Sequence, residues 1–247
     1  MYGKGELKEL WRYNHTPAAL PGSDHRAAVA LDCEMGFSFS GESETIRVSV
    51  VDYYSGECVL DTLVSPDSPI KDYLTRYSGI TARDMDQALA EDKCLFGRAQ
   101  ARQAIFRYVG PETIVVCHGG SSDMNCLRWI HPNVVDTHIV EIEKRQKQRE
   151  ILEKMAGEAG EAKRKEFEAQ LGPGTLSLKR LAMDRLNRNI QTGNKGHDSI
   201  EDAVATRDIA HWHVVATLKE ASSADALLDH LDLEDSTDMK RKRRVSI

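Results

Sequence analysis

Short apolar segments recur along the chain and predict the strands of a sheet: 29–33, 45–51, 57–64, 113–117 and 134–137. The second and third are rich in β-branched residues and flank a polar turn, so we expect them to form an antiparallel meander with the first. Later in the chain, apolar strands surround a helical stretch, which is typical of a parallel α/β unit. The pattern therefore predicts an α/β fold with a mixed five-stranded sheet flanked by helices.

Helical periodicity and helix-start signals fall between these segments. Thr81, followed three residues later by Asp84, is typical of an N-cap with an acid in the first turn and predicts a helix to about Leu89. Asp136 is expected to cap a helix that begins at the next residue. Apolar spacing predicts further helices over 96–108 and 176–186, and a last helix ending near residue 219.

One segment differs in kind from the rest of the chain. Of the 30 residues in 141–170, 16 are charged, eight of each sign, which predicts a solvated helical excursion, with a hairpin break near Gly157 and Gly160. We interpret about 141–172 as a charged helical insertion. Its role stays open between an exposed insertion and a surface that binds RNA or a partner.

These patterns divide the chain into a central domain and two ends. Residues 1–26 lack sustained periodicity and predict an N-terminal arm that packs on the domain edge, and 27–219 form the domain itself. Residues 220–247 become acidic and then basic and predict a disordered tail. The run Lys240 to Arg244 at its end is a candidate nuclear-localisation signal, with a solvated tail or a weak RNA contact as the alternative.

Composition narrows the compartment and the partners. The 247-residue chain has 40% hydrophobic residues, enough for a sizeable core, and no apolar run long enough for a membrane helix. Its five cysteines are odd in number and form no CxxC pair, so we expect a reducing, intracellular location. The net charge of -6 argues against a protein that coats nucleic acid by charge alone, but not against a nucleic-acid enzyme that carries divalent cations.

Two carboxylates interrupt the first apolar strand. Asp32 and Glu34 are two positions apart, so on an extended strand they project from the same face while their neighbours turn into the packing. Two neighbouring carboxylates repel each other, and a cation bound between them relieves the repulsion. All-oxygen ligation selects a hard ion, Mg²⁺ or Mn²⁺.

Three more residues extend this pair into a candidate catalytic set. Asp123 follows an apolar strand, and His197 and Asp202 lie at the start of the last helix. Four carboxylates can hold two Mg²⁺ ions about 4 Å apart, one of which activates the attacking water while the other stabilises the leaving 3′ oxygen of a phosphodiester. His197 is suited to take the proton from that water.

The sequence around these residues resembles that of a known family, the histidine branch of the DEDD superfamily of 3′–5′ exonucleases. The similarity runs from about Ala28 to Val215 and is closest to the REX-type RNA exonucleases. It is carried by the stretches 32–35, 75–81, 135–137, 177–179, 189–191 and 196–203. The resemblance implies an RNase H-like fold.

The resemblance also implies a role for each residue of the set. Asp32 would contact both ions, Glu34 and Asp202 the ion on the nucleophile side, and Asp123 the second ion, with His197 as general base. Met35 and Gly36 fall where such enzymes meet the terminal nucleotide.

The implied activity is a 3′–5′ exoribonuclease that removes nucleoside 5′-monophosphates from single-stranded RNA with two Mg²⁺ ions, for which Mn²⁺ would substitute. Its partners would be RNA 3′ ends and no membrane, and its location the nucleus or the cytoplasm. The alternatives are a DNA-directed 3′ exonuclease of the same fold and a non-catalytic RNA-binding scaffold.

Overall fold

A computed structural model describes residues 13–19, 23–169, 171–193 and 196–244, with side chains up to Ser222. The chain divides into two compact units, the first ending at Ile209 and the second beginning at Ala210. The first unit contains the sheet and most helices, and the second consists of the later part of the last helix. None of the helices in the described part of the chain is long and apolar enough to cross a membrane.

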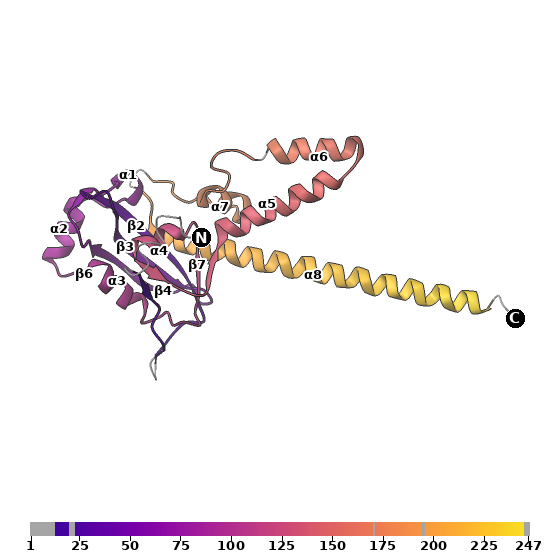
Figure 1. Ribbon diagram of the computed structural model, residues 1–247, viewed down its shortest axis with the longest axis horizontal. Helices are drawn as coiled ribbons and strands as arrows, with labels where there is room; N and C mark the ends of the chain where they lie inside the picture. Colours follow the sequence, from indigo (N-terminus) through magenta and orange to yellow (C-terminus); the bar gives the residue numbers. More distant parts are fainter. Residues whose placement is uncertain (1–12, 20–22, 170, 194–195, 245–247) are drawn as a thin grey trace. The chain divides into compact units, whose positions relative to one another are not determined.

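A mixed seven-stranded sheet forms the centre of the first unit (Figure 1). The strands of the continuous path, in their order across the sheet, are β6 (Cys94–Phe96), β4 (Cys58–Ser65), β3 (Ser43–Asp52), β2 (Ala28–Ser38), β7 (Ile114–Cys117) and β9 (Val134–Asp136), and β5 (Ile70–Asp72) pairs with the end of β2. The β2–β3, β3–β4 and β2–β5 pairs are antiparallel, and the other three are parallel. The five predicted strands are all present. The three-residue strands β5 and β6 bring the sheet to seven.

β2 lies at the centre of this sheet and carries the first predicted carboxylates. Its partner β3 places Arg47 opposite Glu34 and Ser49 opposite Asp32, and the register shifts just after Glu34. On its other side, the first residues of β2 pair with β7 in parallel. Because β2 is hydrogen-bonded to β3 along most of its length and to β7 over residues 28–30, its side chains are held on a rigid support.

Most of the helices were predicted, with some shifts of their ends, but the short helices at 75–78 and 121–126 were not. They are α1 (Thr75–Ser78), α2 (Ala82–Ala90), α3 (Gly97–Ile105), α4 (Ser121–Cys126), α5 (Thr137–Lys154), α6 (Gly157–Ala169), α7 (Leu178–Leu186) and α8 (Ser199–Arg244). Thr81 caps α2 in a capping box with Asp84, and Asp136 caps α5, as predicted. The charged segment is a pair of helices interrupted between Lys154 and Gly157, close to the predicted break.

The last helix is longer than the sequence pattern predicted. α8 continues to Arg244, whereas we expected an end near Lys219. No glycine or proline occurs between Ser199 and Arg244, so nothing in the local sequence stops a helix there. The side chains of the acidic and basic tail lie outside the described residues, and its disorder and its role in localisation stay predictions.

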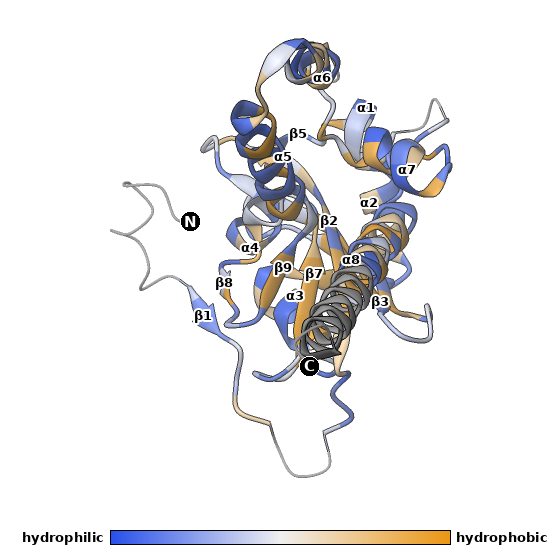
Figure 2. Cartoon of the chain, turned by 90° about the vertical axis from the view of Figure 1, so that its right-hand side faces the viewer, coloured by the Kyte–Doolittle hydropathy of each residue, from blue (hydrophilic) through white to orange (hydrophobic). Residues whose placement is uncertain are grey.

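The core of the first unit joins the sheet to the helices that cover it. Buried side chains of β2, β3, β7 and α3 pack with Leu127 and Trp129, and a second cluster joins α7 to the start of α8. The strands β7 and β9 are mainly orange in the hydropathy colouring of Figure 2, and α6 is largely blue.

The N-terminal arm is described from Tyr13, and this part lies along the domain. The strand β1 (Asn14–His15) pairs in parallel with β8 (Trp129–Ile130). The Tyr13 hydroxyl donates to Asn125 Oδ1 at 2.8 Å.

Candidate active site

Asp32 and Glu34 project from the same face of β2. The residues between and before them, Cys33 and Leu31, are buried in the sheet core on the other face. This alternation follows from the two-residue period of a strand. Glu34 is itself buried, and its Oε1 atom has no hydrogen-bond partner among the described residues.

Asp123 reaches β2 from the neighbouring strand. It lies on the first turn of α4, just after β7, and its Oδ1 accepts a hydrogen bond of 3.0 Å from the Cys33 backbone N–H. The loop that delivers it is fixed by Asp136, whose carboxylate accepts from the backbone N–H groups of Gly119 and Gly120 at 2.9 and 3.0 Å. The parallel pairing of β7 with β2 therefore brings together carboxylates that are 91 positions apart in the sequence.

Asp202 and His197 come from the start of α8. The His197 Nδ1 atom lies 3.5 Å from Asp202 Oδ2. Gln191 donates from its side-chain amide to both carboxylate oxygens of Asp202, at 3.1 and 2.9 Å. The backbone N–H of His197 donates to the Tyr77 carbonyl at 2.6 Å, which anchors the His197 loop to α1.

The four carboxyl groups lie close enough to change one another's ionisation. Burial raises the pKa of Asp32 well above its usual value, and Asp123, Asp202 and Glu34 each raise it further.

Burial is also the largest cause for the other three. It raises the pKa of Glu34 to about 8, with Asp202 adding to the rise and Arg47 opposing it. It raises the pKa of Asp123 to about 7, against hydrogen bonds from Cys33. It raises the pKa of Asp202 to about 6, against the Gln191 hydrogen bond and His197. The positive groups near the cluster therefore do not balance the negative charge that its four carboxylates would carry.

An open cavity of about 600 Å³ lies over this cluster. Asp32, His197 and Asp202 line it together with Gln191 and the chain from Gly172 to Leu178. His118 and His138 complete the lining, with their rings packed edge to face at 5.4 Å. The volume is in the range that encloses a drug-sized molecule, and a single nucleotide is of this size.

His118 has a structural role at the rim of this cavity. Its Nδ1 lies 2.9 Å from Thr137 Oγ1 and its Nε2 lies 3.0 Å from the Leu176 carbonyl oxygen. Burial lowers its pKa, which favours the neutral ring. Both ring nitrogens are therefore engaged within the protein.

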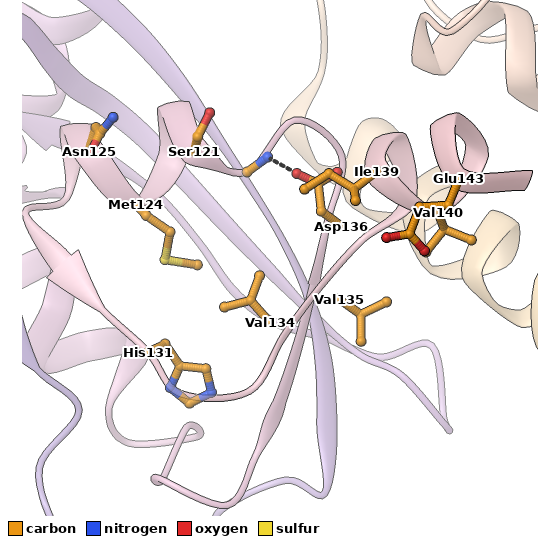
Figure 3. Close-up of a pocket in the computed structure, with 11 residues that line it drawn as sticks. Ser121, Met124, Asn125, His131, Val134, Val135, Asp136, Ile139, Val140 and Glu143 are labelled. Atoms are coloured by element: carbon orange, nitrogen blue, oxygen red, sulfur yellow. Dashed lines mark hydrogen bonds between the residues drawn. The ribbon is translucent and has the colours of Figure 1, made fainter. Parts of the chain in front are cut away.

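A second cavity, of about 420 Å³, lies beside α4, β9 and α5 (Figure 3). Its lining is mostly apolar and includes Met124, Val134 and Ile139. None of the five predicted catalytic residues lines it, although its Asp136 is the residue that holds the Asp123 loop (dashed line in Figure 3). The chemistry therefore belongs to the first cavity.

The predicted nucleotide contacts and one missed residue complete the site. Met35 packs against the sheet core, and Gly36 is buried, where an added Cβ would lie 3.0 Å from the Asp72 carbonyl oxygen. Neither lines the described part of the cavity over the carboxylates. Gln191, which does line it, had no role assigned from the sequence, although it is part of the 189–191 stretch that carries the resemblance.

Comparison with known proteins places this arrangement in context. Residues 29–210 match the model of the RNase T exonuclease family. RNA exonuclease 3 of Candida albicans is 34% identical over 196 residues, covering 79% of this chain and 40% of the relative. The human RNA exonuclease 1 homolog is also 34% identical over 196 residues, covering 79% of this chain and 13% of the relative. The chain thus spans less than half the length of these relatives.

Solved structures share the fold. The Pan2 catalytic unit of Neurospora crassa, described as protease and nuclease domain, has a TM-score of 0.56 and 23% identity, and the match covers 89% of this chain and 33% of that structure. A Saccharomyces cerevisiae Pan2 module in complex with A7 RNA has a TM-score of 0.56 and 22% identity, over 94% of this chain and 36% of that structure. At this identity the likeness shows an RNase H-like fold.

Proposed function

The chain belongs to the RNase T exonuclease family, and on that basis we propose that it is a 3′–5′ exoribonuclease. It releases nucleoside 5′-monophosphates from the 3′ end of single-stranded RNA with two Mg²⁺ ions. The observation that carries the proposal is the convergence of four carboxyl groups from separate elements: Asp123 accepts from the Cys33 N–H, which lies between Asp32 and Glu34, and Asp202 lines one cavity with Asp32 and His197. Both relatives described above are named RNA exonucleases, which favours RNA as the substrate.

The carboxylates fit a pair of hard divalent ions. The donor set is all oxygen, and the buried, unpartnered Oε1 of Glu34 faces a group of other carboxylates. In their present positions, no three His, Cys, Asp or Glu residues of the described ranges form a ready ligand group. Asp202 accepts from the Gln191 amide and Asp123 from a backbone N–H, and such hydrogen bonds orient carboxylates that ligate metal ions.

The roles within the site follow from these positions. Asp32, Glu34, Asp123 and Asp202 would hold the ions, which supply an activated water and stabilise the charge that develops on the phosphodiester oxygens. His197 accepts the proton of the attacking water, and Asp202, 3.5 Å away, orients its ring. Met35 and Gly36, one and two residues after Glu34, are proposed to meet the terminal nucleotide through the backbone.

Arg47 supports the side of the site that carries His197. It forms a fork with Asp61 at 2.8 and 3.0 Å and lies 3.2 Å from Asp198, the residue after His197. It also lowers the pKa of Glu34. Arg47 thus connects the carboxylate strand to the His197 loop, and mixed-charge contacts of this kind keep catalytic groups in register.

The test is degradation of a 5′-labelled single-stranded RNA, with products resolved to single nucleotides. We expect a ladder shortened from the 3′ end in Mg²⁺, nucleoside 5′-monophosphates as products, and no cleavage with EDTA. Asp32→Asn and Glu34→Gln should each abolish cleavage, while Glu112→Gln, an exposed carboxylate outside the site, should leave it unchanged. Undiminished cleavage by Asp32→Asn would refute the proposal.

Two alternatives have distinct outcomes in the same assay. A DNA exonuclease of the same fold would degrade a matched DNA oligonucleotide faster than the RNA. A non-catalytic RNA-binding scaffold would retain the labelled RNA without shortening it in Mg²⁺. A nuclear location is part of the proposal because of the basic run near residue 240, and deletion of that run with imaging of the tagged protein tests it.

A further inference from the structure

The wall of the cavity opposite the carboxylates is a loop with little rigidity of its own. Gly172, Pro173 and Gly174 begin it, and Gly174 has a left-handed φ of +77°. Its internal bonds are short turns, from the Thr175 N–H to the Gly172 carbonyl at 3.2 Å and from the Ser177 N–H to the Gly174 carbonyl at 3.0 Å. A chain of this composition keeps one conformation only when other elements hold it.

Arg145, on α5, holds the middle of this loop. Its guanidinium donates from one nitrogen to Thr175 Oγ1 at 2.7 Å and from the other to the Thr175 carbonyl at 2.8 Å. Both bonds are charge-assisted, and the fork grips the side chain and the backbone of the same residue. The adjacent Leu176 carbonyl is held by His118 from the end of β7.

α5 is itself fixed to the body of the domain one turn before Arg145. Glu141 is fully buried and accepts two bonds from the Arg185 guanidinium of α7, at 2.9 and 3.0 Å. Glu141 and Arg145 are four positions apart, so they lie on the same side of the helix. The first half of the charged segment therefore connects α7 to the cavity wall.

We propose that Arg145 is a positioning residue, which fixes the 172–177 loop at the distance from Asp32 and Asp202 that admits the terminal nucleotide of a single strand. This inference rests on the proposed exonuclease activity and assigns part of the charged segment to the site. The competing explanation is that Arg145 attracts RNA as a positive charge. Its guanidinium is already bonded to Thr175, and the fork geometry is one that a lysine does not reproduce.

The test compares four variants of the full chain. Arg145→Lys keeps the charge and loses the fork, and Arg145→Gln loses both. Thr175→Val removes the bond from Arg145 to the hydroxyl and the hydroxyl's own bond to the Gly172 carbonyl, and keeps the bond from Arg145 to the Thr175 carbonyl. Arg149→Gln is the matched control, because Arg149 lies one turn further along α5, is exposed, and makes no ion pair or hydrogen bond within the described residues. KM and kcat are measured on a short single-stranded RNA, together with hydrogen exchange at the Thr175 and Ser177 amides.

We expect Arg145→Lys and Arg145→Gln to raise KM by about fivefold with kcat within about twofold, because the wall binds substrate and transition state alike. Thr175→Val should give a smaller rise, because the bond from Arg145 to the Thr175 carbonyl is kept. Amide exchange at 175 and 177 should accelerate in both Arg145 variants and stay unchanged in Arg149→Gln. All variants should keep the melting temperature within about 2 °C, because the bonds involve a surface loop.

Three results would overturn the inference. Full retention of KM by Arg145→Lys would show that charge alone matters. An equal rise in KM for Arg149→Gln would show a general electrostatic effect of α5, and unchanged amide exchange in the Arg145 variants would show that the loop does not depend on this residue. Absence of any nuclease activity in the unmodified chain would remove the proposed function instead, and the exchange measurement would still decide whether Arg145 holds the loop.

Discussion

Replacing Glu34 by Gln should stabilise the metal-free protein at alkaline pH. The substitution keeps the shape of the side chain and removes a charge that the fold buries beside other carboxylates. The folded-state pKa of Glu34 lies above its ordinary value of 4.5, at about 8. The folded chain therefore binds this proton more tightly than the unfolded chain. The stabilisation that results is fully present below about pH 4.5 and is lost as the pH rises toward about 8.

The size of the effect follows from the shift. A rise from 4.5 to about 8 sets a ceiling of about 5 kcal/mol on the cost of the ionised Glu34. The cluster shares its protons, because a neighbouring carboxyl group can protonate instead, so the measurable difference is on the order of 2 kcal/mol. For a chain of this length that is roughly 4–8 °C in melting temperature.

Thermal unfolding in EDTA at pH 5 and at pH 9 measures this difference. We expect Glu34→Gln to melt above the unmodified protein at pH 9 and within about 1 °C of it at pH 5, where Glu34 already carries its proton. Glu112→Gln, at an exposed position, should show no such dependence on pH. Saturating Mg²⁺ should stabilise the unmodified protein, by about 2.7 kcal/mol at a hundredfold excess over Kd, and should stabilise Glu34→Gln less.

A lower melting temperature for Glu34→Gln at pH 9 in EDTA would refute the reasoning. It would mean that Glu34 makes a favourable interaction as an anion, with Arg47 opposite it on β3, and that this outweighs repulsion within the cluster. The unmodified protein would then also gain nothing from acidification.

Three further substitutions test the supports of the site. Gly196→Ala should lower kcat at least tenfold on the RNA substrate. Gly196 has φ +88°, and an added Cβ would lie 2.2 Å from the Gly79 nitrogen, so the substitution should displace the neighbouring His197. Gly41→Ala is the control, because Gly41 also has a positive φ but lies in open space, and it should leave kcat unchanged. Asp136→Ala should lower the free energy of unfolding in urea by about 2–3 kcal/mol, because the backbone N–H groups of Gly119, Gly120 and His138 lose their acceptor, and Asp136→Asn should recover part of it. Arg185→Met should cost about 3–5 kcal/mol in the same assay by removing the guanidinium that donates two bonds to the buried Glu141 carboxylate, and Arg185→Met combined with Glu141→Leu should recover most of that. A double variant as unstable as the single one would contradict the account.

The sequence predicted the elements whose signals are local. The β-branched runs of β3 and β4, the capping box of α2 and the Asp136 cap of α5 depend on residues a few positions apart. β5 and β6 were not predicted, because strands of three residues are defined by the partner they pair with. The extension of α8 beyond Lys219 was also missed, because the apolar periodicity used to place the last helix ends there.

The candidate site was likewise predicted only in part. The spacing of Asp32 and Glu34 and the order of Asp123, His197 and Asp202 are visible in the sequence. The contacts that hold these residues are not visible there. The hydrogen bonds from Gln191 to Asp202 and from the Cys33 N–H to Asp123, and the cavity wall at 172–177, join residues that are far apart in the sequence. Periodicity carries no information on such contacts.

These supports explain how a cluster of like charges persists in a folded chain. β2 pairs with β3 through both residues and with β7 just before them, at 28–30, so the backbone that carries Asp32 and Glu34 is held in an extended conformation. The groups that act on the cluster are a backbone N–H, the Gln191 amide, the His197 ring and the Arg47 guanidinium. They stabilise each carboxylate singly without cancelling the total charge, and the repulsion that remains is relieved by protons or by divalent ions. We therefore expect protons and divalent ions to compete for the same oxygens, as a consequence of the architecture of the sheet.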